Sequence, residues 1–258
     1  MVKRYYIYVV KQINQPTMKS IFTLFAVAFL SLSAFAEVSS NQKQALIDLY
    51  NATNGSEWNT TWNLDADVST WHGVRVINNN VVGLNLSMNN LNGHLPESLG
   101  DLDALVTLEL FFNRIQGELP SSIGNLKNLK VLVLNGNMLD GKLPESIYNL
   151  TKLEQLMLTS NNLSGSISND VSKLENLEVL NLFDNNLNGN LPLAVLKLEN
   201  LKELNLSNNQ LAGVVPVELK NMKNLKTLAL AANNFDNYNE GVAFQEDTNA
   251  TSTLASNE

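Results

Sequence analysis

The chain has 258 residues, 44% of them hydrophobic, and a formal net charge of −8. This is enough apolar material for a substantial core, whereas the lack of cysteine excludes disulfides, thiolate nucleophiles and cysteine zinc sites. The acidic balance argues against nucleic acid or an anionic lipid surface as the partner.

Residues 18–36 have the pattern of a secretory signal peptide. A lysine precedes the apolar run 21–35, and small residues stand at Ala34 and Ala36, so cleavage is expected after Ala36. The alternative is an uncleaved anchor, but the run is shorter than the roughly 20 residues that a spanning helix needs. The pattern therefore predicts a secreted, cell-surface or periplasmic protein with no stable membrane span after signal removal.

Residues 1–17 precede this complete signal, and we interpret them as an extension or a misassigned start. Four of the 17 basic residues lie before Glu37, whereas all 25 acidic residues lie after Ala36. The exported chain is therefore expected to carry 13 basic residues and a net charge of −12. This stronger acidity again argues against a nucleic acid partner.

An N-terminal cap is expected at residues 37–80. Residues 40–54 carry apolar side chains at helical spacing and end in an Asn-Gly stop signal, which predicts a helix. The three tryptophans of the chain follow within 14 residues: Trp58, Trp62 and Trp71. Because the end of a repeat stack must be covered, we interpret them as packing residues; the alternative is a ligand-binding cluster.

Residues 81–236 contain about seven copies of one 24-residue pattern. Leucine pairs such as Leu108 and Leu110 alternate as in a strand with one buried face. An asparagine follows the pair in every copy, and its amide is expected to bond the backbone of the turn and to form a buried ladder. These asparagines are Asn89, Asn113, Asn137, Asn161, Asn185, Asn209 and Asn233.

Glycine and proline occupy two further positions of the pattern. The regular glycines indicate a backbone conformation that rejects a side chain: Gly93, Gly117, Gly141, Gly165, Gly189 and Gly213. A proline follows in most copies, often with an acidic residue next, as in Pro96 and Glu97. This pair predicts the start of a short helical turn on the convex side. Ser168 replaces the proline in one copy, where we expect a looser turn.

These positions together resemble the plant-type leucine-rich repeat, LxxLxxLxLxxNxLxGxIPxxLxxL, a class that also occurs in secreted bacterial proteins. The resemblance implies an α/β solenoid, a horseshoe or superhelix with a parallel concave β-sheet and short helical or 3-10 turns on the convex side. It extends to the cap, where residues 71–74 match the family's WxGV. Ser69 and Arg75 stand where the family usually has cysteines, so the cap is expected to rely on aromatic packing.

No pattern for catalysis or for a bound cofactor stands out. His72 and His94 are the only histidines, and neither belongs to a metal-ligand or triad pattern. The acidic pairs in 65–67 and 101–103 offer too few oxygens for calcium. Every regular glycine belongs to the repeat rather than to a phosphate loop. We therefore expect no metal, no cofactor and no enzyme activity.

The candidate binding site is the solvent face of the concave strands, because its residues differ from copy to copy. We predict one apolar patch over four neighbouring repeats, formed by Phe111, Val133, Met157, Val179 and Phe183 and rimmed by Glu109, Gln155, Asp184 and Glu203. The candidate ligand-binding residues are Glu109, Phe111, Phe112, Val131, Val133, Gln155, Met157, Val179 and Phe183. The alternative is apolar residues scattered over an ordinary surface.

The leading hypothesis is a secreted, non-enzymatic binding module that recognises a protein, peptide or glycan on the concave face. The resemblance supports it, since such repeats serve in receptor ectodomains and in extracellular hydrolase inhibitors. Such an inhibitor is one alternative, and a self-associating structural or adhesive component of the cell envelope is another. Residues 237–258 are expected to form a C-terminal cover, closed by Val242 and Phe244, and a disordered acidic tail.

Overall fold

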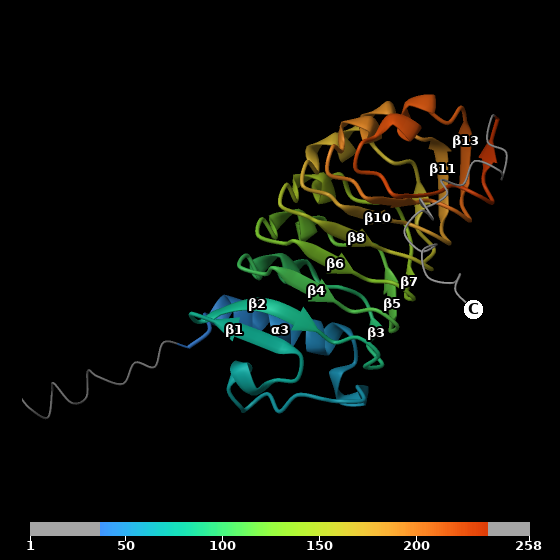
Figure 1. Ribbon diagram of the computed structural model, residues 1–258. Coiled ribbons are helices and arrows are strands. Elements are labelled where there is room, and N and C mark those ends of the chain that lie inside the picture. The colour runs from blue at the N-terminus through green and yellow to red at the C-terminus, as the bar shows by residue number, and fades with distance from the viewer. Residues whose placement is uncertain (1–36, 237–258) are drawn as a thin grey trace, which may run out of the picture. The chain divides into compact units, whose positions relative to one another are not determined.

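The computed structural model describes residues 37–236, and residues 38–236 belong to one compact unit. Figure 1 shows this unit as a stack of turns, each of which adds one strand to a long curved sheet. The solenoid expected from the repeat is thereby confirmed. The expectations for residues 1–36 and 237–258, including the cover by Val242 and Phe244, concern parts of the chain outside the described residues.

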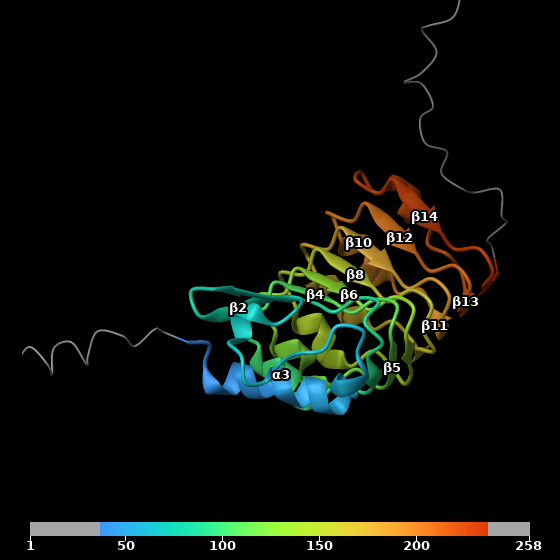
Figure 2. The same cartoon turned by 90° about the horizontal axis from the view of Figure 1, so that it is seen from below.

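The cap begins with helix α3 (Ser40–Ala52), close to the predicted helix. The Ser39 side chain accepts a hydrogen bond from the N–H of Gln42 and so caps its first turn. The Gln42 side chain then joins the helix to the sheet, because its carbonyl oxygen accepts from the N–H of Val81 at 2.8 Å. Figure 2 shows α3 beneath the first strands of the stack.

The tryptophans form one aromatic cluster next to α3 and the short 3-10 helices η1 (Gly55–Glu57) and η2 (Val68–Thr70). Trp58, Trp62 and Trp71 are each at most 5% exposed. The Trp62 ring lies 4.9 Å from that of Trp58 and 4.7 Å from that of Trp71. This burial is the packing expected of a cap without cysteines, and it leaves the indoles no free face for a ligand.

The long sheet has eight strands in the order β1-β2-β4-β6-β8-β10-β12-β14. Only the first pair is antiparallel; the later strands pair in parallel, each with the residue 24 positions further on. The strands are β1 (Val74–Ile77), β2 (Asn80–Asn85), β4 (Thr107–Glu109), β6 (Val131–Val133), β8 (Gln155–Met157), β10 (Val179–Asn181), β12 (Glu203–Asn205) and β14 (Thr227–Ala229).

Two shorter sheets follow the glycine positions on the flank of the stack. One contains β3 (Asn92–Gly93), β5 (Arg114–Gly117) and β7 (Met138–Leu139). The other contains β9 (Ser164–Gly165), β11 (Asn186–Asn190), β13 (Gln210–Gly213) and β15 (Asn234–Phe235). Every regular glycine has a positive φ, from 69° at Gly141 to 144° at Gly93, which explains why a residue without a side chain recurs at this position of the repeat.

The opposite side of each turn is a five-residue 3-10 helix that follows the proline position. These helices are η3 (Glu97–Asp101), η4 (Ser121–Asn125), η5 (Glu145–Asn149), η6 (Asn169–Lys173), η7 (Leu193–Lys197) and η8 (Val217–Asn221). Five of them have proline as the N-cap residue, which confirms the predicted helical turns. The leucines between the two sides are fully buried and form the core.

The expected looser turn at Ser168 is wrong, because η6 has the same length as its neighbours. Serine, unlike proline, has a backbone N–H that must be satisfied. The hydroxyl of Tyr148, which is 2% exposed, accepts it at 3.2 Å, and the Ser168 hydroxyl in turn accepts from the N–H of Asp170. Burial raises the pKa of the Tyr148 phenol, so the hydroxyl keeps its proton.

The asparagine ladder has the predicted bonds. The Asn113 amide donates to the carbonyl oxygens of Leu86 and Leu110, both at 2.9 Å, and its oxygen accepts from the N–H groups of Asn89 and Leu91. In the later copies the amide again donates to a carbonyl of its own turn and to one of the preceding turn, and its oxygen accepts from one N–H of the preceding turn, so each asparagine joins the two turns. The first copy has no preceding repeat, and Thr60 of the cap supplies both backbone partners for Asn89.

Replacing one ladder asparagine is expected to destabilise the whole stack. In Asn137→Ala the buried N–H of Ile115 loses its acceptor, which costs about 1–3 kcal/mol, and the carbonyls of Leu110 and Leu134 each keep only one of two amide donors. Urea unfolding followed by circular dichroism measures the loss, with the exposed Asn125→Ala as control. Equal stability of the two variants would contradict this role for the ladder.

Tyr148 and Ser168 are expected to be coupled energetically. Tyr148→Phe leaves the Ser168 N–H without its acceptor, and Ser168→Pro leaves the buried phenol without its donor, so each change alone is expected to cost about 1 kcal/mol. The double variant has the proline N-cap of the other repeats and leaves no unpaired phenol, so it should cost less than the sum of the two single changes. A double-mutant cycle on urea unfolding measures the coupling, and strict additivity would refute it.

Candidate ligand-binding face

The strand register arranges the solvent-facing side chains of the concave sheet into rows. The first row contains Thr107, Val131, Gln155, Val179, Glu203 and Thr227, and the second contains Glu109, Val133, Met157, Asn181, Asn205 and Ala229. Backbone hydrogen bonds between neighbouring turns continue beyond the strands, as from the N–H of Phe112 to Asn135 and from that of Gly136 to Thr159. They define a third row of Phe111, Asn135, Thr159 and Phe183.

The apolar centre of the face lies where the first two rows cross the middle of the sheet. Val131 and Val133 of β6 lie beside Gln155 and Met157 of β8, and Val179 follows in β10. All five side chains are half-buried. We call Val131, Val133, Met157 and Val179 the apolar floor. These predicted site residues are therefore brought together by the fold.

Polar side chains interrupt the row that contains two of the predicted phenylalanines. Phe111 and Phe183 lie in the same row, but Asn135 and Thr159 stand between them. The N–H of Thr159 donates to the Asn135 side chain at 2.8 Å, and the Thr159 hydroxyl donates to that of Asn181 at 2.9 Å. This polar strip was missed because its bonds link residues 22 and 24 positions apart.

Phe112 forms a separate apolar edge beyond the floor. It is 63% exposed and packs edge to face on Phe111, with ring centres 5.7 Å apart. Its φ is +53°, and a Cβ on Gly136 would approach the Phe112 ring to 2.5 Å, so the glycine leaves room for the ring. Met88 holds the equivalent position one repeat earlier, is 62% exposed and was not among the predicted residues, although its place in the repeat identifies it.

Two carboxylates, those of Glu109 and Glu203, stand at opposite ends of the floor. The Asn85 amide donates to Glu109 at 2.6 Å, and the Asn181 amide donates to Glu203 at 3.0 Å. Among residues 37–236 neither carboxylate forms a salt bridge. The predicted rim residue Asp184 lies past the third row and accepts a bond from the side chain of Asn208.

The charged pairs next to the first row neutralise each other. Lys130 lies 2.6 Å from Glu154, and Lys202 lies 2.7 Å from Glu178. These positions precede the strands and are each partly exposed. Glu109 and Glu203 on the sheet itself have no such partner among residues 37–236.

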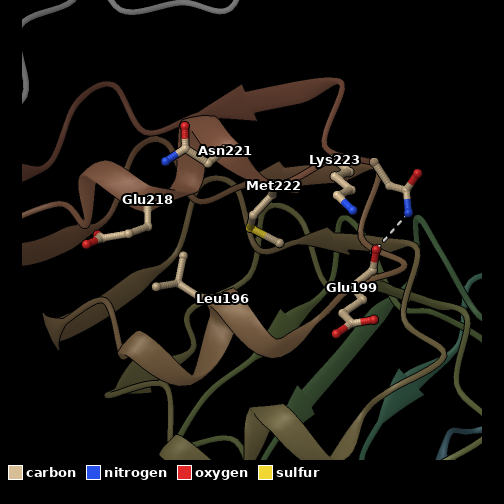
Figure 3. Close-up of a pocket in the computed structure, with 7 residues that line it drawn as sticks. Leu196, Glu199, Glu218, Asn221, Met222 and Lys223 are labelled. Atoms are coloured by element: carbon tan, nitrogen blue, oxygen red, sulfur yellow. Dashed lines mark hydrogen bonds between the residues drawn. The ribbon is translucent and has the colours of Figure 1, made fainter.

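Metal sites, membrane-spanning helices and hollows were sought in the part of the chain that the structure describes. Within residues 37–236 no group of acidic or histidine side chains is arranged to hold a metal ion. No helix in this range has the length and apolar character to cross a membrane. A hollow between η7 and η8, shown in Figure 3, is lined by Leu196, Met222 and polar side chains. There the Asn224 amide donates to the backbone of Glu199, a bond that joins two repeats.

Family models identify the repeats directly. A leucine-rich repeat region matches residues 82–182, a leucine-rich repeat matches 176–198, and a two-copy model of the same repeat matches 199–240. A curated relative, leucine-rich repeat protein FLOR 1 of Arabidopsis thaliana, is 32% identical over 85 residues. The match covers 33% of this chain and 26% of that protein, so the chain spans only about a quarter of the relative.

Solved structures share the fold. A complex of BIR3 and SERK2 from Arabidopsis thaliana contains a chain that is 30% identical, with a TM-score of 0.55, and the match covers 65% of this chain and 93% of that one. A plant peptide hormone receptor, RGFR1 in complex with RGF2, is 37% identical, with a TM-score of 0.54. That match covers 55% of this chain and 23% of the receptor chain.

Proposed function

The chain belongs to the leucine-rich repeat family, and from that premise we propose that it is an exported, non-enzymatic binding module for a peptide or protein segment. The ligand lies on the concave face, over the apolar floor. The observation that carries this proposal is the group of half-buried apolar side chains on the solvent side of that sheet, Val131, Val133, Met157 and Val179. A contiguous group of apolar side chains that solvent still reaches is typical of an interaction site.

The chemistry of the face favours a peptide over a glycan. Met157, Phe111 and Phe112 are of the residue types that are enriched in protein interfaces. The fixed amide and hydroxyl groups of Asn135 and Thr159 add hydrogen-bonding partners beside the floor. The similar receptor that is solved with a bound peptide hormone supports the same ligand class.

Export is proposed on the signal pattern of residues 18–36. The full-length gene product is expected to appear outside the cytoplasm with Glu37 as its first residue. Mass spectrometry of the intact exported protein checks this. A chain that still contains residues 18–36 would contradict cleavage, and a chain that remains in the cytoplasm would contradict export.

Removing the apolar side chains of the face is expected to abolish ligand capture. The triple variant Phe111→Ser, Met157→Ser, Phe183→Ser should recover less than a tenth of the partner that the natural chain captures from its own medium and cell surface. Quantitative proteomics after pull-down measures the recovery, and circular dichroism verifies the fold.

A matched control changes three exposed apolar residues away from this sheet. Leu193, Val214 and Val217 are each more than 60% exposed near η7 and η8, and their replacement by serine should leave capture unchanged. The proposal would be overturned if both triple variants lost partner recovery equally, or if the variant of Phe111, Met157 and Phe183 lost none. Concentration-dependent assembly of the purified chain in sedimentation velocity, without any partner, would favour the self-associating alternative instead.

A further inference from the structure

We infer that the concave face selects an extended peptide with two basic side chains, one at each end of a segment that crosses the apolar floor. Glu109 binds one cation and Glu203 binds the other. This inference rests on the proposed function, because it names the chemical class of the peptide.

The carboxylates of Glu109 and Glu203 both lack a cationic partner among residues 37–236. Each is half-buried, and each is oriented by one amide, from Asn85 in one case and from Asn181 in the other. A carboxylate accepts more bonds than one amide supplies. Within residues 37–236 no lysine or arginine pairs with either group, although two neighbouring lysine–glutamate pairs are formed. Both carboxylates are therefore available to a cationic ligand, with charge-assisted bonds as the result.

Glu109 and Glu203 are separated by a distance that a short extended peptide spans. Glu109 lies in β4 and Glu203 in β12, four strand spacings apart in the long sheet. At about 4.8 Å per spacing this is about 19 Å, and their offset by two residues along the strands gives a diagonal of about 20 Å. An extended peptide rises about 3.3 Å per residue, so six residues span the distance. Because six is even, both basic side chains project from the same face of the peptide.

The apolar floor lies between the two carboxylates. The diagonal passes over Val133, then between Met157 and Gln155, and then over Val179. Peptide side chains two and four residues after the first cation point to this floor. Apolar side chains fit these positions, since they cover half-buried apolar groups without leaving a polar atom unpaired. The selected pattern is therefore basic, apolar, apolar, basic at every second residue.

The net charge of the chain is consistent with this selectivity. The chain carries 25 acidic and 17 basic residues, so a basic peptide approaches an attractive field. Attraction between the partly exposed groups weakens as salt increases. The affinity for the basic peptide is thus expected to fall as ionic strength rises. The contacts with the apolar floor contribute a share of the affinity that salt does not remove.

The test uses the exported full chain and a defined probe. The probe is a fluorescein-labelled, end-blocked peptide of seven residues with lysine at both ends, valine third, leucine fifth and serine or threonine elsewhere. Its isomer exchanges the last two residues, which keeps composition and charge but turns the second lysine to the opposite face. Fluorescence anisotropy is expected to show about tenfold tighter binding of the probe than of the isomer. Equal binding of both peptides would overturn the inference.

Variants assign the effect to the two carboxylates. Glu109→Gln and Glu203→Gln, which keep the side-chain shape, should each weaken probe binding about tenfold and remove the preference over the isomer. Glu175→Gln is the matched control, because this exposed acid lies outside the strands of the long sheet, and it should leave both the affinity and the preference unchanged. An equal loss of the preference in Glu175→Gln, or no loss in Glu109→Gln and Glu203→Gln, would overturn the assignment.

The outcome also separates this inference from the proposed function. If the triple serine variant loses its natural partner while Glu109→Gln and Glu203→Gln capture it as before, the face binds a ligand of other chemistry and only the basic-peptide inference fails. If the triple variant keeps its partner, the proposed function itself fails.

Discussion

The hydrogen bonds of the ladder asparagines are the interaction on which the rest of the structure depends. Each amide is bonded to the turn of its own repeat and to that of the preceding one, so the distance in sequence between stacked residues stays at 24. Buried amides and turn carbonyls are costly to leave unpaired, and no other side chain of this shape both donates twice and accepts twice. The register of the long sheet follows from this constraint.

The ladder also explains how the stack begins without cysteines. Thr60 presents to Asn89 the backbone groups that a preceding repeat would present, so the cap acts as the first turn. The packed rings of Trp58, Trp62 and Trp71 hold that loop in place. At the other end Leu228 is 8% exposed, whereas Leu204 one repeat earlier is fully buried, so the described residues leave the last turn less covered.

Because the buried positions of each repeat stabilise the fold, the residue types at the solvent-facing positions can differ from repeat to repeat. The leucines, the asparagines and the glycines are occupied by stacking, and the concave solvent positions carry valine, methionine, glutamate and asparagine in an irregular order. Because neighbouring strands are in register, each of these residues has a fixed place in a two-dimensional array. Glu109, Glu203 and the floor between them therefore form a pattern that a rigid surface presents to a ligand at little entropic cost.

The sequence by itself determined the solenoid, the ladder, the glycine positions and the side of the sheet on which Val133 and Met157 lie, because a 24-residue period and an alternation of two fix these locally. It did not determine what lies between Phe111 and Phe183, why Ser168 still begins a regular turn, or which acids lack a cation. Those answers depend on partners one repeat away: Thr159 on Asn135 and Ser168 on Tyr148. Only stacking brings such residues within bonding distance, so only the tertiary structure decided the continuity and the charge of the binding face.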